Sequence, residues 1–304
     1  FYTVRERAAT MIGRGKTPDL YGKPESFINS VFALDAGIHY LFFKRFITPS
    51  LFFENGGALS EPREILVRDL ASFDLVNPNK GRLEYRMLNF FNSHDQRRLA
   101  TASHGLAKSR LAMAWISFWP GIPLMYHGDE QGFSSFGAGL EGHAREDMMT
   151  SVAWRDHPAA APFNPADGDN FDMCHPQYRA FQRILAVRRK VRALRIGHEI
   201  AERWIDQEGD RGIYAFTRMP GKEPLEWALV VFNTTAEMRA VPGAIPTGWN
   251  GGERIIDLLG GGDPVTLGPG GTLPHLKMEP FSAKVFVPLS RAVPLEPAVE
   301  SISP

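Results

Sequence analysis

The sequence contains very little cysteine and no excess of charge of either sign. Cys174 is the single cysteine among 304 residues, which excludes an intramolecular disulfide and any metal site built from several thiolates. We expect a buried or partly buried thiol there, the usual state of a free cysteine. The 34 basic and 34 acidic side chains balance, so the composition gives no net cationic field for nucleic acid or anionic lipid. Neutral partners are favoured.

Long apolar runs and an initiator methionine are also lacking. The longest apolar runs, around residues 40–43 and 227–232, fall far short of the roughly 18–20 residues that a membrane span requires. The chain opens at Phe1 within what resembles a strand, with no basic leader and no apolar signal region. We therefore interpret the chain as a piece of a longer protein with no membrane partner, and the compartment stays unknown.

Short apolar runs alternate with amphipathic stretches over residues 1–195. This alternation is typical of βα units in a parallel sheet or barrel. Helical spacing of Leu111, Ala114, Trp115 and Phe118 predicts a helix that ends at Pro120. A last helix is predicted over residues 176–193, with Tyr178, Phe181 and Leu185 on one face, and the predicted strands are 1–4, 29–34, 87–92 and 122–126.

Beyond about residue 197 the pattern changes to short strand-like runs separated by Gly and Pro turns. This pattern is typical of a compact antiparallel β domain. We expect a β domain over residues 196–290 and, because prolines recur without any period, a flexible tail over 291–304. The strands expected in this domain are 213–217, 228–233, 254–259, 265–267, 273–278 and 284–289.

The strongest functional signal is the sequence NFFNSHDQRR over residues 89–98. An apolar strand runs directly into the pair His94-Asp95 and two arginines. At the carboxyl end of a barrel strand, such side chains point to where ligands bind. A carboxylate there can stabilise an oxocarbenium-like transition state, and a histidine can donate to a sugar hydroxyl. Without further context, a pair that caps the next helix is an equally good interpretation.

A second signal is the sequence PGIPLMYHGDEQGF over residues 120–133. It places glycines and acids directly after a strand, one amphipathic helix away from the first motif, which is the spacing of a βα unit. Taken alone, Asp129 and Glu130 are loop acids that cap a helix or form an ion pair.

Together, these blocks resemble two segments of the α-amylase family (glycoside hydrolase family 13), those of strands seven and eight of its barrel. The sequence GHAREDMM over residues 142–149 is similar to a segment that follows strand eight in that family. The resemblance implies an α/β fold, the C-terminal part of a (β/α)8 TIM barrel from about strand five to strand eight, followed by an all-β antiparallel sandwich domain. It covers residues 1 to about 290.

The resemblance also implies roles for individual residues. Asp95 matches the third catalytic carboxylate of the family, and His94 matches the histidine that contacts the sugar. Ser93 stands where the family often has Asn. Glu6, within YTVRE over residues 2–6, matches the general acid at the end of strand five.

Glu6 departs from the family pattern, because Arg5 stands where the family has Gly. An arginine that points into the site would favour the carboxylate and oppose proton donation. Strand alternation that turns Arg5 away removes this conflict. A surface glutamate remains an equal alternative. The nucleophile of the family, an Asp at the end of strand four, falls upstream of Phe1.

Two further residues are expected to contact substrate, Arg98 and Tyr126. The tyrosine can stack on a sugar ring, but packing in the core is an open alternative for it. The loop histidines lack the spacing of a metal triad, so no metal site and no cofactor are expected in this chain. Calcium in the complete protein stays possible by the resemblance.

These inferences lead to a retaining hydrolase of α-glucans such as starch or maltooligosaccharides, an enzyme that acts on O-glycosyl bonds. Because the nucleophile falls outside it, the chain alone is expected to be inactive. Two alternatives stay open: an α-glucan transglycosylase of the same family, and a non-catalytic amylase-like protein that binds carbohydrate.

Overall fold

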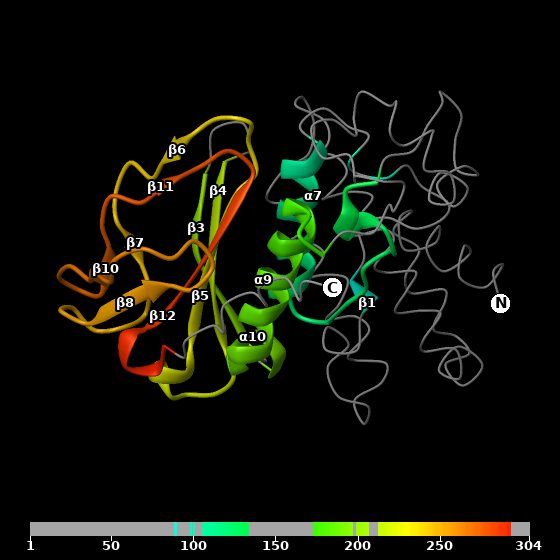
Figure 1. Ribbon diagram of the computed structural model, residues 1–304. Helices are drawn as coiled ribbons and strands as arrows, with labels where there is room; N and C mark the ends of the chain where they lie inside the picture. Colours follow the sequence, from blue (N-terminus) through cyan, green and yellow to red (C-terminus); the bar gives the residue numbers. More distant parts are fainter. Residues whose placement is uncertain are drawn as a thin grey trace, which may run out of the picture.

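In the described part of the chain, three helices lie against one face of an antiparallel sheet (Figure 1). A separate pair of parallel strands adjoins the two sequence motifs. No helix in the described part of the chain is both long and apolar enough to cross a membrane. The computed structural model describes residues 88–89, 98, 100, 105–133, 173–196, 199–206 and 212–292.

Several predicted features lie outside the described residues. They are the strands 1–4 and 29–34, the segment 142–149 and all of the tail beyond residue 292.

The strands that carry the two motifs are neighbours. Strand β1 (Leu88–Asn89) pairs in parallel with strand β2 (Ile122–Pro123), and Leu88 lies opposite Ile122. Helix α7 (Gly105–Phe118) connects them, as the sequence predicts for a βα unit. Strand β2 ends at Pro123 and is shorter than the predicted 122–126.

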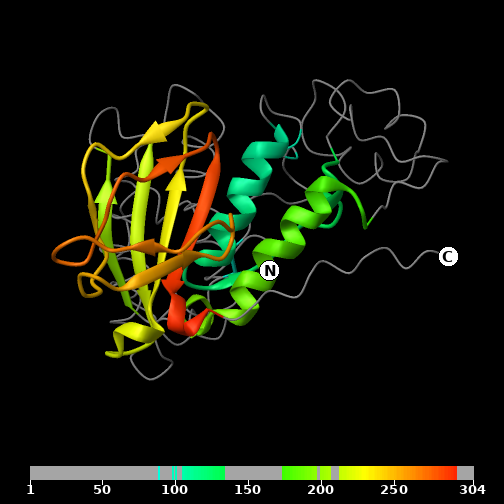
Figure 2. The same cartoon turned by 60° about the vertical axis from the view of Figure 1, so that its left-hand side comes forward.

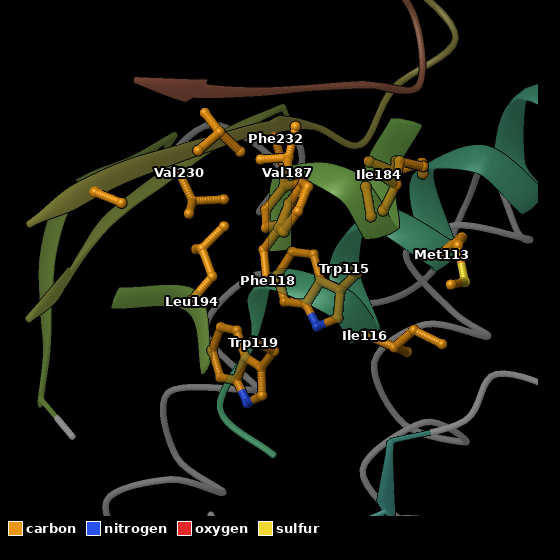
Figure 3. Close-up of a cluster of buried hydrophobic side chains, with 14 of the residues drawn as sticks. Met113, Trp115, Ile116, Phe118, Trp119, Ile184, Val187, Leu194, Val230 and Phe232 are labelled. Atoms are coloured by element: carbon orange, nitrogen blue, oxygen red, sulfur yellow. The ribbon is translucent and has the colours of Figure 1, made fainter. Parts of the chain in front are cut away.

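Helix α7 is buried on nearly all sides. Its residues from Leu111 to Phe118 are all buried, although the helical spacing predicted one apolar face only. A helix that is apolar around its circumference must be covered on every side. The centroid of the Trp115 ring lies 4.4 Å from that of Phe232 and 5.1 Å from that of Trp119 (Figure 3).

The predicted last helix is divided into α9 (Pro176–Lys190) and α10 (Arg192–Ile196), which are separated at Val191. Helices α7 and α9 lie side by side along the sheet (Figures 1 and 2). The predicted face of α9 is wrong in part, because Leu185 is exposed. The side that packs into the core carries Phe181, Ile184 and Val187, a pattern with a three-residue step.

The N-terminus of α9 corrects the expectation for the single cysteine. Cys174 is exposed, so the prediction of a buried or partly buried thiol is wrong. It lies in a turn just before the helix, and the Arg179 Nη2 atom lies 3.6 Å from its sulfur. His175 at this helix end is buried, and its Nδ1 atom accepts a hydrogen bond from the Gln177 N–H.

The β domain is built on one six-stranded antiparallel sheet in the order β3-β4-β5-β12-β8-β9. The last strand among the described residues, β12, lies in the middle, between β5 and β8. Two predicted strands, β4 and β5, agree closely with the sequence, whereas β3 was not predicted. The bounds are β3 (Glu199–Ile205), β4 (Ile213–Met219), β5 (Ala228–Asn233), β8 (Arg254–Asp257), β9 (Val265–Thr266) and β12 (Ser282–Pro288).

Both faces of this sheet are covered. Strand β5 turns Val230 and Phe232 toward the helices and Leu229 and Val231 toward the opposite side. This alternation follows from the two-residue period of a strand. Strand β5 therefore reads as one continuous apolar run, because neither face meets water.

Two short strand pairs lie with the loops that cover the outer face. They are β6 (Arg239–Ala240) with β11 (Lys277–Met278), and β7 (Ile245–Pro246) with β10 (Thr272–Leu273). The single predicted strand 273–278 is thus two separate strands. The antiparallel β-rich character of this region is confirmed. Short 3-10 turns complete it: η10 (Pro224–Glu226) and η11 (Leu289–Arg291).

Two arginines hold the C-terminal end of α7, where backbone carbonyls lack partners within the helix. Arg188 of α9 donates to the Ser117 carbonyl at 2.6 Å and to the Gly121 carbonyl at 2.7 Å. Arg218 of β4 donates to the Phe118 carbonyl. Burial, and to a lesser extent Arg195, lower the pKa of Arg188 to about 10, so it stays charged at neutral pH.

Replacing Arg188 by Met should lower the free energy of unfolding by about 2–4 kcal/mol, because buried carbonyls lose charged donors. Urea titration followed by tryptophan fluorescence measures this change. Its exposed neighbour Arg189 provides the control, and R189M should alter stability by no more than about 0.5 kcal/mol. Equal effects of the two substitutions would contradict this account of the helix end.

The cap of α9 gives a second prediction. His175→Ala removes the side-chain acceptor at the helix N-terminus and should cost about 1 kcal/mol. His175→Asn retains an acceptor and should cost less. Thermal unfolding of the two variants would contradict the capping role if they were destabilised equally.

Candidate functional site

The candidate site lies at the carboxyl ends of β1 and β2. Carboxyl ends of neighbouring parallel strands meet at one edge of a sheet, where ligands bind in barrel folds. Between β1 and α7 the structure describes Arg98 and Ala100. After β2 it describes all residues from Leu124 to Phe133. These two segments meet through a buried ion pair.

The ion pair joins Arg98 and Asp129. The Arg98 Nη1 atom donates to the Asp129 Oδ1 atom at 3.0 Å, and the side chains are 0% and 2% exposed. The guanidinium carbon lies 4.5 Å from the centre of the Tyr126 ring and 5.8 Å from that of Phe133. Arg98 is therefore enclosed between a carboxylate and two aromatic rings, a contact set suited to the planar guanidinium.

The loop after β2 is a tight turn that depends on glycine. Gly128 has φ +88°, and a Cβ atom there would come within 2.4 Å of the Phe133 ring. The turn η6 (Asp129–Gln131) follows, and the Phe133 N–H donates back to the Gly128 carbonyl at 3.1 Å. The carboxylate of Glu130 accepts from the Gly128 N–H at 2.9 Å. The loop is thus fixed by its own hydrogen bonds.

Tyr126 stands between the strand and this turn. Its ring packs on the Arg98 guanidinium, and the His127 ring lies edge-on at 4.6 Å. Its hydroxyl is buried and has no hydrogen-bond partner among the described residues. Tyr126 itself is half-buried, so ring packing and a polar contact of the hydroxyl are both compatible with its position.

The structure brings together two of the residues expected at the site, Arg98 and Tyr126. The substrate contact expected for each stays a prediction, and the described contacts of Arg98 are with protein groups. Asp129 forms the ion pair that was one of its two expected roles. Asp95, His94 and Glu6 lie outside the described residues.

One contact of the site was missed in the sequence. Gly132, at φ +68°, lies against His175, since a Cβ atom on it would be 3.5 Å from the histidine Cε1 atom. The turn after β2 thus rests on the N-terminus of α9. The sequence shows that residue 132 is a glycine in a glycine-rich loop, but it does not show which of these glycines has a positive φ.

Arg98 and Asp129 neutralise each other in a buried ion pair. Within the described ranges no three His, Cys, Asp or Glu side chains are grouped as a metal site would require.

Sequence comparisons agree with the two strand-end motifs. Residues 65–194 match the family model of the α-amylase catalytic domain. An α-amylase of Streptomyces lividans is 30% identical over 168 residues, which covers 51% of this chain and 18% of that protein. The cell wall α-1,3-glucan synthase ags1 of Schizosaccharomyces pombe is 23% identical over 292 residues, covering 76% of this chain and 12% of that one.

Solved structures agree on the fold. An α-amylase from Geobacillus thermoleovorans, in complex with acarbose, superposes with a TM-score of 0.57 and 17% identity. The superposition covers 81% of this chain and 46% of that one, so the chain spans less than half of this solved structure. The match over residues 65–194 contains both motifs and the helix between them. This segment of the chain is therefore similar to the α-amylase catalytic domain.

Proposed function

We propose that the chain is part of a retaining α-glucan glycoside hydrolase that acts on starch-type oligosaccharides or polysaccharides. The observation that supports the proposal is the parallel pairing of β1 with β2, because the two sequence motifs continue from these neighbouring strands. The family match over residues 65–194 supports it. The proposal includes a (β/α)8 barrel, partly formed by residues 1–195, and a β-sandwich over 196–290.

In this proposal Glu6 is the general acid, and its protonated carboxyl delivers a proton to the leaving glycosidic oxygen. An aspartate outside this chain attacks the anomeric carbon and forms a covalent glycosyl-enzyme. Asp95 stabilises the positive charge that develops on the sugar ring, and His94 donates a hydrogen bond to a hydroxyl. Water then displaces the enzyme, and the anomeric configuration is retained.

Tyr126 borders the same edge, where its half-buried ring offers an apolar surface to a sugar. Neutral α-glucan fits a chain without net charge. No cofactor is proposed for this chain, and calcium in the complete protein stays a prediction.

Two alternatives remain. The relative named as an α-1,3-glucan synthase favours a transglycosylase, in which a second sugar replaces water as acceptor. Products longer than the substrate would identify this reaction. Arg5 in place of glycine favours a non-catalytic carbohydrate-binding protein. Retention on immobilised amylose without any turnover would identify that case.

Asp95→Asn in the gene product that contains this chain should lower kcat about 100-fold or more, because a charge that stabilises the transition state is lost. Unfolding by urea should be little changed. The matched control is Asp263→Asn in an exposed loop of the β domain, which should leave kcat unchanged. An unchanged kcat in the Asp95 variant would refute its catalytic role.

Residues 1–304 expressed alone should release no sugar from maltooligosaccharides, because the nucleophile is expected elsewhere. The gene product that contains the chain should release sugar with the α configuration, which proton NMR of the first products detects. Robust turnover by residues 1–304 alone would contradict the assignment of the nucleophile. Products of β configuration would contradict the retaining mechanism.

A further inference from the structure

We infer that Arg98 and Asp129 are a positioning pair for the proposed glycosidase site. Resting on the proposed function, this inference gives Arg98 a different role from the substrate contact expected in the sequence. Their ion pair fixes Arg98, which follows the pair His94-Asp95 in the chain, to the turn that follows β2. Neither side chain is assigned a contact with the sugar.

The Arg98 and Asp129 side chains are both almost fully buried, and the Arg98 Nη1 atom lies 3.0 Å from the Asp129 Oδ1 atom. Removing charges from water is costly, and such a pair adds less to stability than apolar residues of similar volume often do. A buried ion pair therefore fixes the relative positions of its two residues more than it stabilises the fold.

The two residues of the pair follow different sequence motifs. Arg98 lies three residues after Asp95, and Asp129 lies six residues after Pro123, where β2 ends. The pair thus joins two loops that are 31 residues apart in the chain. It therefore fixes a residue only three positions after the proposed catalytic carboxylate in the chain.

The Arg98 guanidinium also contacts an aromatic ring and the backbone of the turn. It lies against the Tyr126 ring. Gly128 lets the turn approach Arg98 closely, since a Cβ atom at Gly128 would lie 3.2 Å from the Arg98 Nη1 atom. Lysine at position 98 retains the charge but not the planar fork. A positioning role therefore requires the shape of arginine as well as its charge.

The experiment compares R98K with the double variant R98M/D129L in the gene product that contains this chain. The double variant removes both buried charges, so its melting temperature should stay close to that of the wild type. Its kcat on maltooligosaccharide should nevertheless fall about 10- to 100-fold, because small displacements of catalytic groups are costly. KM should change much less. R98K should show the same split in a milder form.

The matched control is Lys284→Met, which removes an ion pair of the same length, 3.0 Å, between Lys284 and Asp257 in the β domain. It should leave kcat unchanged. A double variant that is stable and retains the wild-type kcat would overturn the positioning role, and so would an equal loss in K284M.

Amide hydrogen exchange separates this inference from the proposed function. If the pair links the loops, exchange in peptides 90–100 and 126–133 should rise in R98K and in the double variant, but not in peptide 213–233. This result would support the link even if the wild type had no glycosidase activity, which would refute the proposed function alone. Unchanged exchange in both loops would overturn the link.

Discussion

The need to cover helix α7 on every side determines how the rest of the molecule is arranged. Its residues 111–118 are all buried, and two tryptophans add large apolar rings at 115 and 119. The six-stranded sheet covers one side through Tyr214, Phe216 and Phe232, and α9 covers another. One continuous core therefore spans the helices and the β domain. The strand pair β1–β2 is attached to this core through α7, so the position of the candidate site follows from the burial of the helix.

Buried arginines complete that arrangement where apolar packing ends. Arg188 and Arg218 come from different elements, and both donate to carbonyls at the end of α7. Arg98 has a carboxylate as its partner instead. Each planar group provides several donors in a fixed direction, which an apolar contact cannot do. The helix end just before β2 and the loop just after it are thus both held by directional bonds.

The sequence predicted those elements whose residues have a strong period or a strong motif. Helix α7, strand β5 and the parallel pairing of the two motif strands follow from apolar spacing and from the helix-long gap between the motifs. Prediction was poorer where tertiary contacts determine which residues are buried. Leu185 has helical spacing but is exposed, because α9 turns the face with Ile184 to the core. Strand β3 contains Glu199, Glu202 and Arg203 among its apolar residues, which concealed its period.

At the candidate site, local sequence predicted residue types but not partners. Asp129 could be recognised as a loop acid, yet only the parallel pairing of β1 and β2 explains why Arg98 is its partner. Likewise, the contact of Gly132 with His175 joins segments more than 40 residues apart, and no local pattern contains it. For Cys174 the prediction relied on a general tendency of cysteines to be buried, but its place in a turn leaves it exposed.

The central place of β12 in the sheet has a consequence for synthesis on the ribosome. Strands β5 and β8 have no direct pairing in the sheet and meet only through β12, which includes residues 282–288. A nascent chain that has emerged up to β9 therefore carries two sheet halves with open edges, and its helix α7 is incompletely covered. Such edges and apolar surfaces favour aggregation. Translation must reach the last strand before the sheet can close, so a premature stop shortly before residue 282 would leave a chain that depends on chaperones.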